Sequence, residues 1–169
     1  MTDAGALPTY ELVDGIAVIT LDDGKANAMG HATLGEMTSG VDQMRALVAR
    51  GARWWLRVYG LGMPTVAACT GHALAGGAIT LLSCDVRIGA DGPAKIGLNE
   101  VAIGMPLPKF AVELARERLL KSHFVLATLG TTFDPAGAVA AGYLDRVVPA
   151  ESVVDEAVAE ARRLGELRT

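Results

Sequence analysis

The chain has 169 residues, of which 51% are hydrophobic and 20% charged, and its formal net charge is -4. This composition predicts a single globular domain over residues 1–169 and excludes a disordered tail. The mild acidity gives no basic footprint for nucleic acid or anionic lipid. Without a long apolar run or a signal-like N-terminus, we expect a cytoplasmic protein with no membrane partner.

The first predicted element is a β-hairpin. Residues Thr9 to Val13 and Ile16 to Leu21 flank Asp14-Gly15, a dipeptide typical of two-residue hairpin turns. The second of these strands is apolar on both faces, which predicts a position inside a sheet. A loop follows at Lys25 to Ala28.

The next predicted element is a helix over Val41 to Tyr59, whose apolar residues recur at helical spacing opposite charged ones. Gly60, Gly62 and Pro64 end it.

The central stretch predicts a strand, a small-residue turn and a helix at Thr65 to Cys69, Gly71 to Gly77 and Ala78 to Ser83. A chain that leaves a strand and enters a helix through Ala75-Gly76-Gly77 places unpaired backbone N–H groups at a helix N-terminus. Glycine lets a ligand approach the main chain closely. This turn therefore suits an oxygen atom that becomes negative during a reaction.

Glu100 follows the central turn and precedes the apolar run Val101-Ala102-Ile103. A carboxylate among apolar neighbours is expected to resist ionisation, so it could exchange a proton near neutral pH. The alternative interpretation is an ordinary surface glutamate in a loop.

The remaining residues predict alternating strands and helices. Ser122 is a candidate N-cap, and Asp134-Pro135 predicts an N-cap with proline at the first helical position. The predicted elements are a strand at Asp85–Ala90, helices at Pro108–Leu120, His123–Leu129 and from Asp134 to Gly142, a strand at Tyr143–Val148 and a helix at Glu151–Leu167. This alternation indicates an α/β fold with a parallel sheet.

Cysteines and histidines give weaker signals. Cys69 and Cys84 lie in apolar runs and are interpreted as buried small side chains, with a disulfide or a reactive thiol as the alternative. No spacing supports a zinc site. His72 is expected to be a hydrogen-bonded structural residue, and Asp85 a structural capping acid. The motifs of serine hydrolases, phosphate loops and dinucleotide-binding turns are missing from the sequence.

The central stretch resembles the crotonase superfamily, the enoyl-CoA hydratases and isomerases. The matching segments are Gly71-His72-Ala73-Leu74-Ala75-Gly76-Gly77-Ala78, Cys84-Asp85-Val86-Arg87-Ile88, Gly97-Leu98-Asn99-Glu100 and Gly104-Met105-Pro106, in the family's order and spacing. The resemblance implies a crotonase-like (ClpP/crotonase) core, a spiral of β-β-α units.

The resemblance also implies a site and partners. Gly76 would donate one oxyanion-hole N–H, Glu100 would be the general acid/base, and Lys25, Ala26 and Ala28 would lie beside the adenine of coenzyme A. The implied substrate is an acyl-CoA of fatty acid metabolism, with coenzyme A as part of the substrate and no other cofactor. Family members form trimers or dimers of trimers. Trp54 and Trp55 would pack beside the acyl group, with a specific ligand contact as the alternative.

Two departures from the family pattern limit what the resemblance implies. In this resemblance Ile79 occupies the position of the first glutamate of the hydratases. The sequence therefore leaves three functions open: hydration, isomerisation, and a non-catalytic subunit that binds CoA or takes part in assembly. About one helix and one strand, with the second oxyanion-hole donor, are missing between Leu34 and Gly35, and the C-terminal helices are missing too. Either the natural chain is shorter or this sequence lacks an internal stretch. We favour the second, because losing an interior strand leaves unpaired backbone groups and a gap in the core.

Overall fold

The computed structural model describes residues 9–13, 15–21 and 40–166, and side chains only from residue 48 onward in the last range. The predicted adenine-side residues Lys25, Ala26 and Ala28 lie outside these ranges, and so does the junction between Leu34 and Gly35.

A parallel three-stranded sheet forms the centre of the fold, as the alternation of strands and helices predicted. Its order is β3 (Val66–Cys69), β5 (Val86–Ala90) and β7 (Arg146–Val148), with β5 in the middle. Val66 pairs with Val86, and Ile88 pairs with Arg146. Helices cover both faces of this sheet, which is the usual arrangement for parallel strands.

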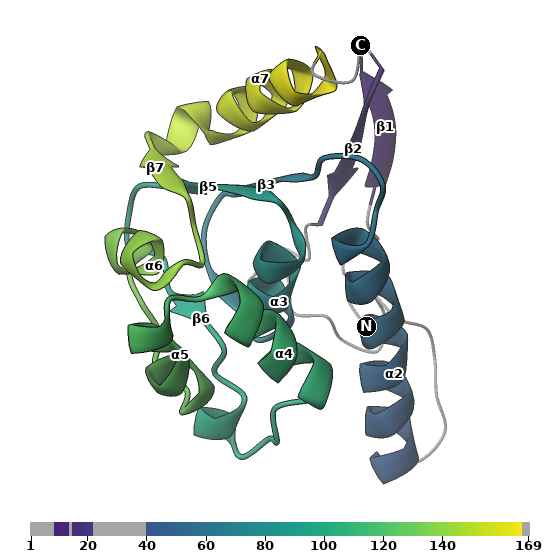
Figure 1. Cartoon of the computed structure of the whole chain (residues 1–169), viewed down its shortest axis with the longest axis vertical. Helices are drawn as coiled ribbons and strands as arrows, with labels where there is room; N and C mark the ends of the chain where they lie inside the picture. Colours follow the sequence, from purple (N-terminus) through teal and green to yellow (C-terminus); the bar gives the residue numbers. More distant parts are fainter. Residues whose placement is uncertain (1–8, 14, 22–39, 167–169) are drawn as a thin grey trace, which may run out of the picture.

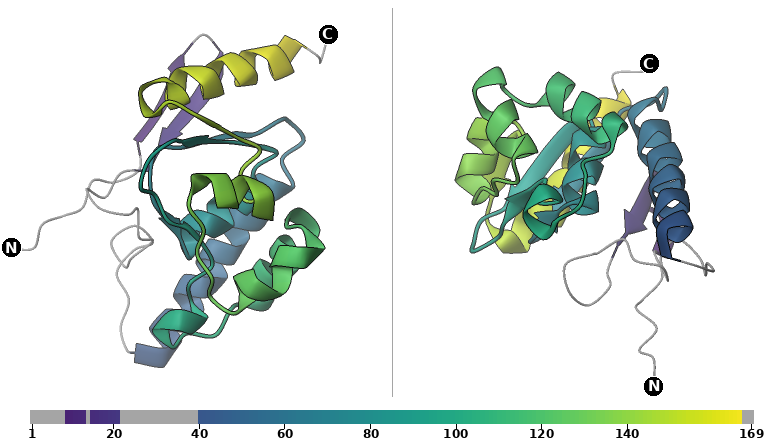
Figure 2. Two further views of the ribbon diagram at one scale, coloured as in Figure 1. Left: turned by 90° about the vertical axis from the view of Figure 1, so that its left-hand side faces the viewer. Right: turned by 90° about the horizontal axis from the view of Figure 1, so that it is seen from below.

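Helix α7 (Val153–Glu166) lies across one face of the sheet, and α3 (Gly76–Ser83) lies on the other (Figure 1). Beyond α3 come α4 (Lys109–Arg118), α5 (Lys121–Thr128) and α6 (Pro135–Ala141), which Figure 2 shows grouped on the side away from α7. The long helix α2 (Gly40–Tyr59) packs against α3. Two short 3-10 helices complete the described elements, η1 (Val101–Ile103) and η2 (Ala150–Ser152).

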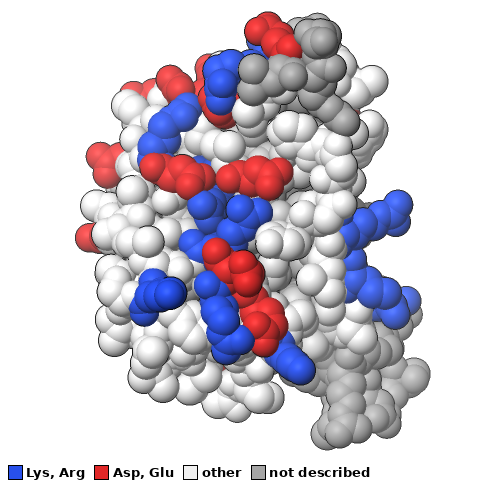
Figure 3. Space-filling model, viewed as in Figure 1, with Lys and Arg blue, Asp and Glu red and all other residues white. Residues whose placement is uncertain are grey.

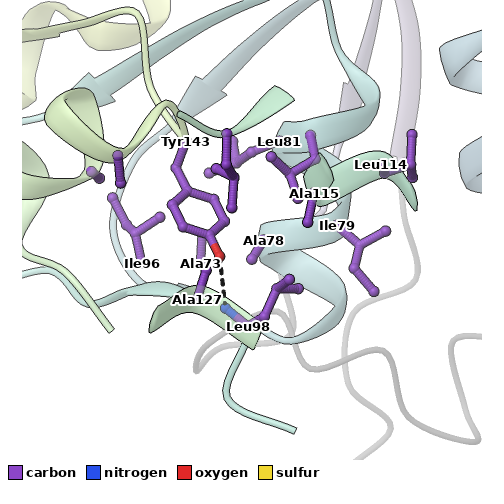
Figure 4. Packing of buried hydrophobic residues seen from close by; sticks show 14 of the residues in the cluster. Ala73, Ala78, Ile79, Leu81, Ile96, Leu98, Leu114, Ala115, Ala127 and Tyr143 are labelled. Carbon is purple, nitrogen blue, oxygen red and sulfur yellow. Dashed lines mark hydrogen bonds between the residues drawn. The ribbon is translucent and has the colours of Figure 1, made fainter. Parts of the chain in front are cut away.

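The hydrophobic core has two parts. The larger part lies between the sheet and helices α2, α3, α4 and α6, and it includes the fully buried Leu82, Leu98 and Tyr143. The smaller part joins α7 to the sheet through Ile88 and Val153. Figure 4 shows how the larger cluster surrounds the ring of Tyr143.

The predicted hairpin forms, but the prediction that its second strand is interior is wrong for the described residues. β1 (Thr9–Val13) pairs antiparallel with β2 (Ile16–Thr20), and Gly15 takes a φ of 79° at the turn. The two strands make a separate two-stranded sheet, and Ile19 is 56% exposed. Within the described residues β2 has only β1 as a hydrogen-bonded neighbour, so apolar residues on both of its faces do not place it inside a sheet.

Several predicted boundaries also need correction. Helix α3 begins at Gly76, two residues before the predicted start, because both glycines of the turn adopt helical conformation. Leu120, not Ser122, is the N-cap residue of α5. The region predicted as a turn contains a two-residue strand, β4 (Ala73–Leu74), which pairs in parallel with β6 (Ile96–Gly97). Strands this short carry no readable periodicity.

Other local predictions are confirmed. Asp134 caps α6, since its Oδ1 accepts a hydrogen bond from the Gly137 N–H, and Pro135 follows at the first helical position. Gly142 ends that helix with a φ of 95°. Cys69 and Cys84 are free and buried, as their apolar runs predicted.

An ion pair between the buried Arg87 and the exposed Asp145, whose side chains are 8% and 41% exposed, joins the middle strand to the segment that precedes β7. The guanidinium of Arg87 donates to both carboxylate oxygens of Asp145, at 3.1 and 2.7 Å, and to the Gly142 carbonyl at 2.7 Å. The backbone N–H of Arg87 also donates to Asp145, at 2.7 Å. Arg87 is only 7% exposed, so this network fixes the register of β5 and β7 from within the fold.

The surface shows no strong separation of charge on the face drawn in Figure 3, where basic and acidic side chains are interspersed. No helix in the described ranges is both long and apolar enough to cross a membrane.

Candidate active site

The glycine turn at the start of α3 is preceded by a strained residue. Ala75 has φ 49° and ψ -115°, a conformation that a residue with a side chain adopts only when its surroundings enforce it. Two hydrogen bonds hold it: its N–H donates to the Gly97 carbonyl at 3.1 Å, and its carbonyl accepts from the Ile79 N–H at 3.0 Å. The turn is therefore fixed to β6 on one side and to its own helix on the other.

The first three amides of α3 are free. Among the described residues, the N–H groups of Gly76, Gly77 and Ala78 donate no hydrogen bond. Because the Ala75 carbonyl points along the helix toward Ile79, the Gly76 N–H in the same peptide plane points the opposite way, out of the helix. The N–H of Gly76 therefore points away from the helix and donates no hydrogen bond within the described residues.

Glu100 reaches the same region from the neighbouring strand. In the parallel pair of β4 and β6, Leu74 is opposite Gly97, so the chain continues toward Gly76 on one side and toward Glu100 on the other. Neighbouring strands lie about 4.8 Å apart, which keeps these two segments close where they leave the sheet. The structure therefore brings the two predicted site residues to the same end of β4 and β6.

Glu100 has a buried environment, unlike that of a surface carboxylate. Its side chain is 5% exposed, and its Oε2 has no hydrogen-bond partner among the described residues. Burial raises the pKa of this carboxyl above its ordinary value, and a hydrogen bond from its own backbone N–H opposes that shift only in part. The interpretation of Glu100 as an exposed loop glutamate is wrong.

Tyr143 and Asn99 belong to this region and were not singled out from the sequence. The hydroxyl of Tyr143 accepts a hydrogen bond from the Leu98 N–H at 3.3 Å, drawn as a dashed line in Figure 4. Burial raises the pKa of Tyr143, and the Glu100 carboxylate raises it further, while the Leu98 N–H lowers it. Asn99 has a buried Oδ1 without a partner in the described part of the chain. In the sequence, the only signal that could have identified Asn99 is its position next to Glu100.

Replacing Tyr143 with Phe should destabilise the protein while keeping the packing of the ring. Both Tyr143 and Leu98 are fully buried, so the variant leaves the Leu98 N–H without an acceptor in the core. We expect a loss of about 1–3 kcal/mol in the free energy of unfolding, measured by urea denaturation. Tyr59→Phe is the matched control, since Tyr59 is 40% exposed and lies on the surface under Arg118. Equal stabilities for the two variants would contradict the assigned hydrogen bond.

His72 and Asp85, the other polar candidates from the sequence, accept hydrogen bonds that connect segments of the fold. The Nδ1 of His72 accepts the Lys95 N–H at 2.9 Å, and Asp85 accepts from the N–H and hydroxyl of Thr65. Ile79, which the resemblance places at the position of the first hydratase glutamate, is 2% exposed and belongs to the large apolar cluster. The described part of the site therefore offers one carboxylate, that of Glu100, and apolar surface where a second would be needed for paired-acid chemistry.

The α3 amides and the buried Glu100 follow the paired strands β4 and β6 at the same end, beside the parallel sheet, an arrangement that fits the crotonase-like fold the resemblance implied. A family model for enoyl-CoA hydratase/isomerase matches residues 47–168. This chain belongs to the enoyl-CoA hydratase/isomerase family.

Individual relatives agree with this assignment. An enoyl-CoA hydratase/isomerase family protein from Pseudomonas syringae superimposes with a TM-score of 0.87 and 38% identity, covering 94% of this chain and 83% of that one. The probable enoyl-CoA hydratase echA8 of Mycobacterium tuberculosis is 34% identical over 152 residues, 89% of this chain and 58% of that protein. Mouse mitochondrial enoyl-CoA delta isomerase 1 is 38% identical over 105 residues, 61% of this chain and 36% of that protein. The chain thus spans between about a third and three fifths of these curated relatives.

Proposed function

We propose that this chain forms the catalytic part of an enzyme that acts on acyl-CoA thioesters and moves a carbon–carbon double bond. The observation that carries the proposal is that the free α3 amides and the buried Glu100, whose Oε2 has no hydrogen-bond partner among the described residues, follow β4 and β6 at the same end. The names of relatives support the substrate class, since both enoyl-CoA hydratases and enoyl-CoA delta isomerases are among them.

In the proposed reaction the thioester oxygen of a 3-enoyl-CoA accepts a hydrogen bond from the Gly76 N–H. The Glu100 carboxylate removes a proton from C2, and the electron pair moves onto the thioester oxygen as an enolate. The protonated Glu100 then delivers the same proton to C4, and the electrons return to form the 2,3 double bond. A preorganised amide of this kind typically contributes on the order of 3 kcal/mol of transition-state stabilisation.

A single carboxylate favours isomerisation over hydration. Isomerisation needs one group that carries a proton between two carbons, and Glu100 suffices for that. Hydration requires a water molecule to be oriented and deprotonated, a task that the hydratases of the resembled family share between two glutamates. Ile79 can neither hold water nor move a proton, and its burial leaves no room for either task.

The test is a comparison of two substrates with the purified full chain. We expect 3-enoyl-CoA to be converted to 2-enoyl-CoA, followed by the absorbance of the conjugated thioester. Hydration of crotonyl-CoA should be slower by about 10²-fold or more, the scale of one missing acid/base group. Faster hydration than isomerisation would overturn the assignment to isomerases.

The second candidate is a non-catalytic subunit that binds CoA or assembles with a partner. Ile79 in the glutamate position favours it, as does the absence of a second oxyanion-hole donor from the described residues. Calorimetry that detects acyl-CoA binding while no thioester is turned over would support this candidate. The adenine-side role of Lys25, Ala26 and Ala28 and the trimeric assembly stay predictions.

A further inference from the structure

Two hydrogen bonds connect helix α2 to the glycine turn. The indole Nε1–H of Trp55 donates to the hydroxyl oxygen of Thr80 at 3.0 Å. The same hydroxyl donates to the Gly76 carbonyl at 2.9 Å, four residues earlier in α3. Trp55 is 6% exposed, so this connection runs through the protein interior, from a residue that the sequence indicated only as packing.

The turn needs such support because it has no side chains of its own to pack. A methyl group built on Gly77 would have only the Cβ of Ala73 within reach, at 3.7 Å. Glycine is also the residue with the widest choice of backbone conformations, so consecutive glycines do not hold a single geometry by themselves. The strain at Ala75 adds a tendency to relax. The hydrogen bond from the Thr80 hydroxyl to the Gly76 carbonyl restricts the conformations that the glycines can adopt.

The indole of Trp55 is itself rigidly placed. Its ring stacks on Phe110 of α4, with ring centres 5.6 Å apart and planes at 22°, and it meets the edge of Trp54 at 6.2 Å. Gly51, one turn earlier, leaves room for it, since a methyl group there would come within 2.5 Å of the ring. Because Phe110, Trp54 and Gly51 surround its ring, the Trp55 side chain has few available rotamers, and its N–H stays directed at Thr80.

We propose that Trp55 and Thr80 are positioning residues for the oxyanion-binding turn. The indole N–H selects one orientation of the Thr80 hydroxyl, and that hydroxyl fixes the Gly76 carbonyl and with it the peptide plane that carries the Gly77 N–H. The first turn of α3 is thereby held in the geometry in which its free amides face outward. The catalytic consequence rests on the proposed function, whereas the positioning itself does not.

The kinetic test uses Trp55→Phe, which removes the N–H but keeps an aromatic ring, and Thr80→Val, which removes the hydroxyl but keeps the branched shape. We expect each variant to lower kcat on 3-enoyl-CoA about fivefold with KM nearly unchanged, the scale of one neutral hydrogen bond. The double variant should be no slower than the slower single variant, because both interrupt one chain of hydrogen bonds. Thr80→Ser should restore the wild-type kcat.

The control is Tyr59→Phe, which removes a polar atom from a 40% exposed ring of the same helix, outside this chain of hydrogen bonds. It should leave kcat at the wild-type value. A Trp55→Phe variant that behaves like Tyr59→Phe would overturn the proposal.

Amide hydrogen exchange of Ile79 gives a readout that does not require turnover. Its N–H is bonded to the Ala75 carbonyl at 3.0 Å and so reports on the opening of the first turn. We expect about fivefold faster exchange in Trp55→Phe and Thr80→Val, and no change in Tyr59→Phe. If the wild-type chain turns over no thioester, the proposed function fails and the exchange rates still decide the positioning role. Unchanged exchange in both variants would overturn it.

Discussion

Replacing Glu100 with Gln should abolish most of the proposed isomerase activity, with a fall in kcat of about 10²–10⁴-fold on 3-enoyl-CoA. The amide has nearly the same shape as the carboxyl group but cannot accept the C2 proton. Glu117→Gln, the same change at an exposed position of α4, is the matched control and should keep the wild-type rate. Equal rates for the parent and Glu100→Gln would remove the acid/base role from this residue.

The pH dependence of the parent gives a second signature of the same group. Glu100 must be ionised to take the proton, and burial raises its pKa, so kcat/KM should rise with pH through a value above that of an ordinary glutamate. This rise of kcat/KM with pH, the acidic limb of the profile, should be missing from the residual activity of Glu100→Gln. An acidic limb at the ordinary pKa of an exposed glutamate would contradict the buried position of the side chain.

Stability should change with pH in the opposite direction from activity. When the pKa of an acid is higher in the folded state than in the unfolded state, the folded state binds more protons between the two values. The free energy of unfolding of the parent should therefore fall as pH rises from the unfolded pKa through the raised pKa of Glu100. Glu100→Gln should lack this decrease, which urea denaturation at about pH 4 and about pH 7 can measure.

Replacing Asp145 with Ala should be the most destabilising single substitution that we predict, at about 2–4 kcal/mol, since Arg87 is buried although Asp145 is 41% exposed. The variant leaves the guanidinium of Arg87, which is 7% exposed, with only the Gly142 carbonyl as a hydrogen-bond partner among the described residues, and it removes the acceptor of the Arg87 backbone N–H. A buried charge without its counter-ion costs far more than the loss of a surface pair. Thermal or urea unfolding of the full chain measures the loss.

The control for this prediction is an exposed ion pair on α4. Glu113 and Arg116 lie 2.7 Å apart with side chains 51% and 55% exposed, so Glu113→Ala should cost about 0–1 kcal/mol. If Asp145→Ala were no more destabilising than Glu113→Ala, the network around Arg87 would not be a structural anchor of the sheet.

The sequence predicted the elements with strong local signals. The parallel sheet, the long helix ending at Tyr59 and the Asp134 cap follow from periodicity and from capping chemistry that each segment carries by itself. Strand β4 escaped prediction because two residues show no period, and the exposure of β2 depends on which strands pair beside it. Both are tertiary properties.

The candidate site could be predicted in part. Gly76 and Glu100 became candidates because the resemblance to a family identified the motifs around them, and the apolar neighbours of Glu100 indicated a raised pKa. Tyr143, Thr80 and Trp55 act through contacts between elements separated by 25 to 45 residues in the chain, and no local pattern reports such contacts. Burial of a hydroxyl or an indole becomes visible only when the elements are assembled.

The unusual backbone of Ala75 has a consequence for any attempt to transplant this chemistry. Its conformation is enforced by the pairing with Gly97 and by the helix that follows, not by the residue itself. A peptide cut out around the glycine turn would relax to an ordinary conformation, and its amides would be lost to water. The reactive geometry is therefore a property of the assembled molecule, and grafting the motif onto another scaffold would require carrying both neighbouring segments with it.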